Sequence, residues 1–433
     1  MRDKVALLGL LVLAGCAANP AIGAARRGDR AELKAAILAR EKTGNLSNGD
    51  AADIAKAVVE HDLAQAKPDE ALDRVREVVA CGHELDGVLR ERMKVHDTAG
   101  AVAALARVEA GGLDDGDARE YLGDADERWR AVGARGLVRE KDRDARAHAL
   151  VDTSPYVRRE ATRAAKAAAD PADLGALLDA ARVDPEPLVR TEAVRAIAAL
   201  PSLPGANVSG RLRDLFAAAD GPLREDIAVA WAAPSLYGSG GRDQLLLVLA
   251  QTHGQSALEA SAAVLRLPPA SGPRDVDDLA VAQLVGAIKE GSRRDRLHAL
   301  AVARPERSPD ILAAIDKAAE DDDFEVRVAA LARLTERADR RGKAVQALET
   351  FAGEPNPLRV RALLALGSAG DMRVQKWMEE VLASADPNER LAAAAALVAL
   401  GRSSRAAPLL ADEDPSVRMR AACTLLMAAR IKG

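Results

Sequence analysis

Apolar residues recur at helical intervals along most of this chain. Val189, Ala193, Ile197 and Leu200 are three or four residues apart, a spacing that places them on one face of a helix. Shorter apolar stretches with the same period lie between such segments, at 174–181, 245–250, 311–319, 344–351 and 374–382. Asp, Gly and Pro clusters separate them, and almost nothing alternates with the period of a strand. The pattern predicts an all-α chain built from helix pairs.

A short motif recurs ten times, with an apolar residue before Arg and Ala three residues after it. Four copies are clear, and they begin at Val157, Val189, Val326 and Val417. Weaker copies fall at 129–130, 223–224, 358–359 and 389–390, and degenerate ones at 258–259 and 295–296. From Arg130 to Arg418 the mean spacing over nine intervals is 32 residues. A helix pair of this size buries its apolar face only by stacking on its neighbours, so the period predicts a solenoid.

Several copies carry a helix start in the sequence itself. Ser154-Pro155, Asp184-Pro185, Asp386-Pro387 and Asp414-Pro415 each combine an N-capping oxygen with a proline suited to the first turn. We therefore expect the Val-Arg helices to begin at these positions.

The motif Asp-Pro-x-Val-Arg-x-x-Ala-x-x-x-Leu resembles the HEAT repeat in its short bacterial, HEAT-like form, over residues 124–433. The resemblance implies a right-handed α-solenoid of about ten stacked antiparallel helix pairs, with the Val-Arg helices on the concave side. It also implies a structural ladder in which the arginines bridge to acids such as Asp184, Asp386 and Asp414. The ladder residues would be Arg158, Arg190, Arg327, Arg359, Arg390 and Arg418.

Two regions depart from the repeat. The joins at 201–210, 232–242 and 267–274 are rich in Pro, Gly and Ser where the family has tight turns, so they either carry function or bend the array. Residues 16–123 are helical but out of phase, with helices expected at 20–28, 29–43, 50–66, 69–80, 85–95 and 99–110. We interpret this region as an N-terminal helical cap or degenerate repeats.

Composition agrees with such an array. The chain is 48% hydrophobic, which excludes wholesale disorder, but only 2% aromatic, which does not suit a large compact core. Alanine at the contacts would let neighbouring helices approach closely. The net charge of −5 gives no field that attracts nucleic acid.

The first residues resemble a bacterial lipoprotein signal. Arg2 and Lys4 precede an apolar run, 5–13, that is well short of the ~20 residues needed to span a bilayer. Leu13-Ala14-Gly15-Cys16 then matches the lipobox, which implies removal of 1–15 and acylation of Cys16. Ala17, where Asp commonly marks inner-membrane retention, favours the outer membrane. The alternative is that 5–13 is the first buried helix of a cytosolic protein.

The other two cysteines, Cys81 and Cys423, stand near opposite ends of the sequence. Each lies in an apolar helical pattern. We therefore expect two separate buried thiols rather than a disulfide.

Known catalytic and metal-binding patterns are absent. His83-Glu84 lacks the second histidine of a zinc-protease motif, and the six histidines are scattered. The glycines at 238–241 lack the strand and Lys of a phosphate loop, and the acids at 320–325 suit a helix start better than a calcium loop. The arginine clusters at 293–296 and 337–341 have no interleaved aromatics for stacking bases. We expect no catalytic residue, cofactor, metal or nucleic acid.

The favoured hypothesis is a non-catalytic scaffold, monomeric and anchored by lipid in the bacterial envelope, that binds a partner protein on its concave face. A broad surface of mixed charge suits a protein better than a small molecule. Two alternatives stay open. One is an enzyme accessory, or an enzyme such as the HEAT-like lyases and glycosylases, and the other is a structural spacer without a specific partner.

Overall fold

The structure is a computed structural model that describes residues 19–203, 205–219, 221–268, 275–353 and 355–430. Within these ranges the chain forms 26 α-helices, several short 3₁₀ segments and no β-strand. The protein is therefore an all-α solenoid, as the periodicity predicted. The leader 1–15 and Cys16 lie outside the described residues. No helix in the described ranges combines the length and the apolar composition needed to cross a bilayer.

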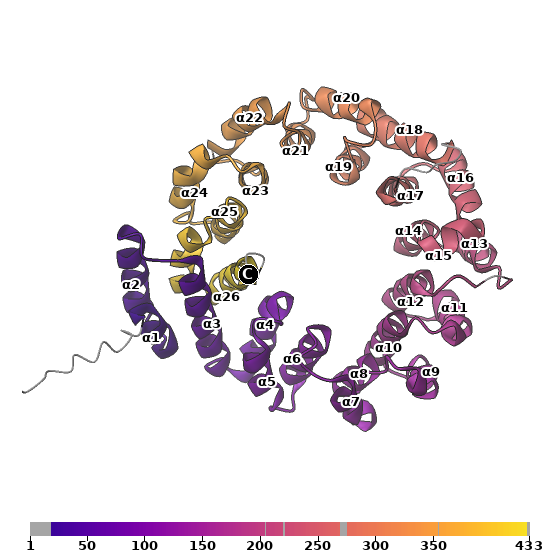
Figure 1. Cartoon of the computed structure of the whole chain (residues 1–433), viewed down its shortest axis with the longest axis horizontal. Helices are drawn as coiled ribbons and strands as arrows, with labels where there is room; N and C mark the ends of the chain where they lie inside the picture. Colours follow the sequence, from indigo (N-terminus) through magenta and orange to yellow (C-terminus); the bar gives the residue numbers. More distant parts are fainter. Residues whose placement is uncertain (1–18, 204, 220, 269–274, 354, 431–433) are drawn as a thin grey trace, which may run out of the picture.

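The helices are arranged in two concentric layers that form a ring (Figure 1). The inner layer is α4 (Pro68–Val78), α6 (Thr98–Glu109), α8 (Glu127–Arg135), α10 (Pro155–Ala168), α12 (Pro187–Ala199), α14 (Gly221–Ala230), α17 (Gln255–Arg266), α19 (Arg293–Val302), α21 (Phe324–Leu334), α23 (Arg359–Ala369), α25 (Pro387–Ala399) and α26 (Pro415–Arg430). The outer layer is α3 (Asn48–Ala64), α5 (Asp86–Met93), α7 (Asp115–Ala118), α9 (Arg143–Ala149), α11 (Leu174–Val183), α13 (Val208–Ala218), α16 (Arg242–Gln251), α18 (Asp275–Glu290), α20 (Pro309–Ala318), α22 (Arg341–Gly353), α24 (Gln375–Val381) and the 3₁₀ segment η7 (Ser403–Ala411).

The repeat motif marks the inner layer. All ten copies, from Arg130 to Arg418, fall in the first turns of successive inner helices, α8 to α26. The shorter periodic stretches at 174–181, 245–250, 311–319, 344–351 and 374–382 are outer helices, as expected. Most helix starts also agree, but α12 begins at Pro187 rather than after Pro185, and the Ser154 side chain forms no capping hydrogen bond.

Small residues let the inner helices pack closely. Alanines of successive inner helices, such as Ala164, Ala196 and Ala396, are buried in one continuous apolar cluster. A Cβ at Gly367 in α23 would overlap Ala396 in α25, so this contact requires glycine. Large rings would hold such helices apart, which explains why an extensive core needs few aromatics.

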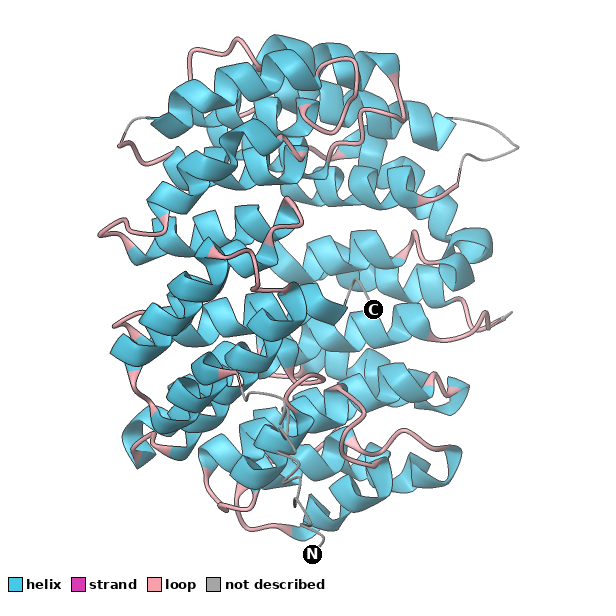
Figure 2. Cartoon of the chain, turned by 60° about the vertical axis from the view of Figure 1, so that its left-hand side comes forward, coloured by secondary structure: helices cyan, strands magenta, loops and turns pink. Residues whose placement is uncertain are grey.

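The region expected as a cap, described from residue 19, continues the same two layers. Its helices lie close to the expected ranges. Ala104 of α6 is buried in one apolar cluster with Trp129 and Val132 of α8. At the other end, α3 and α4 pack against α26, and α2 (Arg30–Lys42) packs against η7. The two ends of the chain therefore meet, and the solenoid closes into a ring (Figures 1 and 2). We call this meeting of α2, α3 and α4 with η7 and α26 the seam.

The ring has two edges, defined by the loops that flank the inner helices. Arg158 in the first turns of α10 reaches Asp184 just before α12, so the loops that precede inner helices lie side by side. Ser235 Oγ donates to the Ala198 carbonyl at the end of α12 across 3.2 Å, which brings the following loops together. We call these the start edge and the end edge.

The six predicted ladder arginines share one contact. Each donates to a backbone carbonyl in the segment before its own helix: Arg158 to Asp152, Arg190 to Asp184, Arg327 to Asp321, Arg359 to Ala352, Arg390 to Ser384 and Arg418 to Asp412, across 2.7–3.1 Å. Their first role is thus to fix the loop at the start edge.

Ion pairs to the following repeat come from a subset of these arginines. Arg158 Nε lies 2.7 Å from Asp184, Arg390 Nε lies 2.9 Å from Asp412, and Arg359 lies 3.3 Å from Glu389. Asp386 and Asp414 do not take the partner role proposed for them, because each accepts from the backbone N–H two residues on and caps its own helix. The loops that follow Arg190 and Arg327 include residues 220 and 354, which lie outside the described ranges.

Arg418 carries the ladder across the seam. Its Nη2 lies 2.8 Å from Asp62 of α3, and both side chains are about nine-tenths buried. Ser416 donates to Glu77 across 2.6 Å, Arg405 lies 3.1 Å from Glu41, and the Ser404 N–H donates to Asn48 across 3.0 Å. The last inner helix, α26, therefore packs on the first outer helix, α3, through the same kind of contacts that join neighbouring repeats.

A disulfide joins the same two ends. Cys81, which ends the 3₁₀ turn η1 (Val79–Cys81), is bonded to Cys423 of α26, with their Cα atoms 5.5 Å apart. Both residues are buried, as expected, but the expectation of two separate thiols is wrong. That expectation assumed that residues far apart in the sequence are also far apart in space. Ring closure brings together these two residues, which are 342 positions apart.

We predict that Arg418→Ala destabilises the ring. Removing one partner of a buried ion pair costs about 3 kcal/mol, because Asp62 is left buried without its cation. Arg420→Ala, on the same helix but about half exposed, is the matched control and should change the unfolding free energy by less than about 0.5 kcal/mol. Urea unfolding of both variants measures the difference, and equal midpoints would contradict the seam contact. Arg190→Ala should also lower the midpoint, through loss of its loop hydrogen bond.

We predict that peptide mapping without reductant recovers a cross-linked pair containing Cys81 and Cys423. Cys81→Ala/Cys423→Ala should lower the unfolding free energy by about 2–4 kcal/mol, since the bond constrains a very long loop in the unfolded chain. Cys16→Ser serves as the control and should leave both results unchanged. Recovery of Cys81 and Cys423 as free thiols from protein made in an oxidising compartment would contradict the bond.

Candidate functional site

Ion pairs between neighbouring helices cover one half of the inner layer. Arg163 of α10 lies 3.7 Å from Glu109 of α6 and 3.4 Å from Glu192 of α12. Glu192 is 3.3 Å from Arg195, which lies 2.9 Å from Asp226 of α14. The chain of alternating charges links four inner helices. Because these charges neutralise one another, this half offers few free charged groups to a ligand.

Two acids in this half are largely removed from water. Burial raises the pKa of Glu160, although Arg163, Arg159 and Arg135 oppose the shift. Burial also raises the pKa of Asp226, and the hydrogen bond from Arg195 opposes it. Both carboxylates are held among arginines of adjacent repeats, an arrangement that tightens packing without assembling a nucleophile and base.

The inner layer changes character after α14. Glu259, which replaces the ladder Arg in α17, lies 2.9 Å from His298 of α19. The hydrogen bond from His298 lowers the pKa of Glu259 against the opposing effect of burial. The residue that breaks the repeat motif at 259 therefore makes an alternative bridge between repeats.

A groove of about 680 Å³ follows, formed by α19, α21 and α23 of the inner layer. We call it the inner groove. Its apolar lining includes Leu297, Ala301, Val328, Ala329 and Leu364. Leu364 is 40% exposed, which is unusual for a leucine in a well-packed helix layer.

Arginines flank this apolar lining. Arg294, Arg333 and Arg361 line the inner groove with Glu336 as the acid. Arg333 pairs with Glu336 across 2.6 Å, and Arg361 pairs with Glu325. Arg294 is exposed and makes no ion pair with any described residue. A groove that combines an exposed leucine with an exposed guanidinium outside any ion pair suits a peptide segment that carries both an apolar and an acidic side chain.

The acidic run 320–325, interpreted from sequence as a helix start, has that role and a second one. Asp323 accepts from the Glu325 N–H across 2.9 Å and so caps α21. Its carboxylate also lies 3.0 Å from Arg293 of α19, and Glu325 contacts both Arg293 and Arg361. These acids therefore join three inner helices beside the inner groove.

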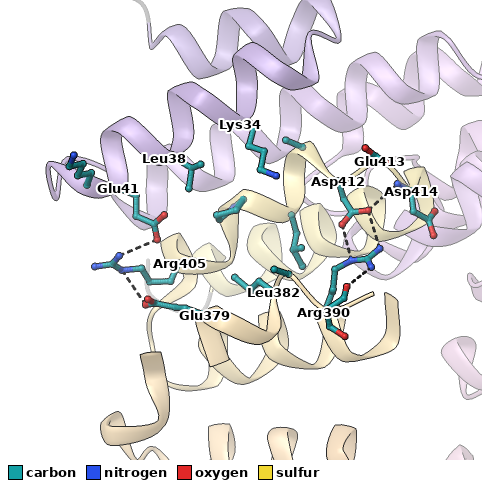
Figure 3. Close-up of a pocket in the computed structure, with 16 residues that line it drawn as sticks. Lys34, Leu38, Glu41, Glu379, Leu382, Arg390, Arg405, Asp412, Glu413 and Asp414 are labelled. Atoms are coloured by element: carbon teal, nitrogen blue, oxygen red, sulfur yellow. Dashed lines mark hydrogen bonds and ion pairs between the residues drawn. The ribbon is translucent and has the colours of Figure 1, made fainter. Parts of the chain in front are cut away.

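A second groove, of about 830 Å³, lies at the seam between α2 and the segment α24–η7 (Figure 3). Leu38, Leu382 and Leu409 contribute its apolar lining. One end is closed by Arg405 between Glu41 and Glu379, at 3.1 and 3.6 Å, and the other by Arg390 with Asp412. Burial raises the pKa of Glu41, and Arg405 opposes this shift. Since both chain ends contribute walls, the groove depends on ring closure.

The other positions considered from sequence do not assemble a reactive centre in the described part of the chain. No group of three or more His, Cys, Asp or Glu residues there could hold a metal ion. The glycines at 238–241 lie in a kinked helical turn, where Gly240 has φ of 93°. A hollow of about 390 Å³ lies beside it, and the described residues that line this hollow have no titratable side chain. Its polar groups include the hydroxyl of Ser239, which is hydrogen-bonded to that of Ser202.

Sequence reasoning missed the inner groove. It singled out Arg293 and Arg294 as a basic cluster, but Leu364 is one of many leucines with helical spacing. The groove appears only when three helices about 32 residues apart are placed side by side.

Comparison with known proteins gives no family assignment. No protein-family model and no curated protein matches the chain. Among solved structures, the YibA protein of Escherichia coli is similar over 65% of this chain and 98% of its own, at 15% identity and a TM-score of 0.38. An engineered protein is similar over 80% of this chain and 98% of its own, at 19% identity and a TM-score of 0.30. Neither similarity is strong enough to assign a function, so the fold rests on the helix arrangement described above.

Proposed function

We propose that this protein is a lipid-anchored, monomeric, non-catalytic scaffold of the bacterial envelope that binds a partner protein inside its ring. The inner groove of α19, α21 and α23 is the observation that carries the proposal. Its partner would be a polypeptide segment that places an apolar side chain against Leu364 and an acidic one against Arg294.

The inner groove suits this role better than the groove at the seam. The seam groove lies between α2 and the outer elements α24 and η7, away from the interior of the ring where the partner is proposed to bind. Arg294 belongs to the inner layer, is exposed and forms no ion pair with a described residue, so its guanidinium can bind an acid of a partner. Charge complementarity of this kind gives an interface its orientation, and the apolar contact supplies the burial.

The envelope location has support from two independent features. The lipobox sequence Leu13-Ala14-Gly15-Cys16 implies export and acylation. The buried bond between Cys81 and Cys423 is of a kind that persists mainly in oxidising compartments such as the periplasm. A cytosolic protein would have no comparable reason to keep this bond. The outer membrane remains the favoured site because Ala17 follows the cysteine.

We predict that Leu364→Asp/Arg294→Glu abolishes capture of a specific protein in cross-linked pull-downs from envelope membranes. The substitutions place negative charge where the partner's acid and apolar side chains would bind. Leu188→Asp/Arg211→Glu, which changes an exposed leucine and an exposed arginine elsewhere, is the matched control and should retain the same protein. The proposal fails if the wild type recovers no specific protein, or if the two variants behave alike.

We predict that Cys16→Ser abolishes labelling of the protein with radioactive palmitate, because it removes the thiol that the lipobox marks. The Cys81→Ala/Cys423→Ala variant keeps Cys16 and should label normally. Unchanged labelling of Cys16→Ser would contradict the lipid anchor while leaving the partner experiment unaffected.

A further inference from the structure

The start edge of the ring is acidic for a local reason. Its loops supply the caps of the inner helices, and Asp126, Asp323, Asp386 and Asp414 each accept from a backbone N–H in the first turn. Acids are favoured there because the helix N-terminus carries partial positive charge. The repeat therefore brings the acids of successive loops to one edge, including the run 320–323 and residues 412–414.

Part of the end edge has the opposite charge. Five exposed cations lie in four segments there: Lys42 at the end of α2, Arg341 and Lys343 at the start of α22, Lys376 in α24, and Arg402 before η7. We call these five residues the basic arc. None of them forms an ion pair with a described residue.

Most acids of the same segments do not cancel this charge, because they are already paired, and only Glu349 and Glu380 of these segments form no ion pair with a described residue. Asp339 lies 2.9 Å from Arg340, Glu336 lies 2.6 Å from Arg333, and Glu41 lies 3.1 Å from Arg405. Asp371 is paired with Arg373. The cations of the basic arc are therefore in excess. Met372, which is 41% exposed, lies within the arc and adds an apolar side chain.

The described chain begins beside this arc. Asn19 donates to Asp50 across 3.2 Å, and Asp50 also pairs with Arg40 of α2 across 2.9 Å. The neighbouring Asn48 accepts from the Ser404 N–H, two residues after Arg402. Asn19 is three positions after Cys16, so an acyl chain on that cysteine would hold this part of the end edge within a short reach of the bilayer.

We propose that the basic arc is a docking surface for an anionic phospholipid bilayer, and that the ring rests on the membrane with its end edge inward and its acidic start edge outward. The orientation rests on the lipid anchor of the proposed function, whereas the docking surface rests on charge alone. Basic residues near a membrane are attracted to anionic headgroups. The lipid anchor and the basic arc thus place the same edge of the ring against the membrane.

The test uses the full chain carrying Cys16→Ser, so that no acyl chain contributes to binding. Its sedimentation with vesicles of phosphatidylglycerol and phosphatidylcholine is compared with vesicles of phosphatidylcholine alone. Lys42→Glu/Lys343→Glu/Arg402→Glu should weaken binding to the anionic vesicles about tenfold or more, and added salt should weaken wild-type binding in the same direction. These three side chains form no hydrogen bond or ion pair with a described residue, so the fold is expected to tolerate the change.

The control, Lys67→Glu/Arg211→Glu/Lys289→Glu, makes the same change in net charge at exposed positions away from the arc. It should retain binding within about threefold, because the attraction falls off within a Debye length of the surface. Equal binding to both kinds of vesicle, or equal loss in both variants, would overturn the docking surface. Capture of an acidic soluble protein by the arc without binding to vesicles would overturn it as well. Palmitate labelling and the pull-down measure the proposed function separately, so either proposal can fail alone.

Discussion

The contact between the last inner helix and the first helices of the chain is the constraint on which the rest of this structure depends. A helical solenoid has an interface at each end that normally needs a separate polar cap. Here α26 packs on α3 and α4, so each end covers the other. Arg418 repeats with Asp62 the contact that Arg158 makes with Asp184, and the bond between Cys81 and Cys423 secures it. Closure is therefore one more copy of the repeat interface.

Closure also determines where binding surfaces lie. In an open array the Val-Arg helices would form a broad concave face, whereas in a ring they face inward and are reached through its edges. Interlocked ion pairs cover α6 to α14, and the departure at Glu259 precedes a less covered stretch that includes Leu364. The scaffold and its candidate binding groove are thus parts of the same layer, and the groove is distinguished by its exposed apolar lining.

The two edges share their capping chemistry and differ in the cations that their loops carry. Each inner helix requires a cap at its start, and an aspartate meets that requirement, so acids gather at the start edge. The loops that follow the inner helices cap the outer helices in the same way, as Asp371 does, but part of this edge also carries Arg341, Lys343 and Arg402. A ring with unlike edges has a preferred orientation at any charged surface, which an open and irregular array would lack.

The sequence by itself determined the helical fold and the period, because these depend on spacing, caps and small residues within one or two repeats. The resemblance to HEAT-like repeats added the inner position of the Val-Arg helices and the bridge from Arg158 to Asp184. Only the tertiary structure decided that the array closes, that Cys81 meets Cys423, and that Leu364 and Arg294 line one groove. The reason is physical: the curvature of the array is the sum of small rotations between neighbouring helix pairs, and the sequence pattern within one repeat does not specify any of these rotations. Contacts across the seam depend on that sum.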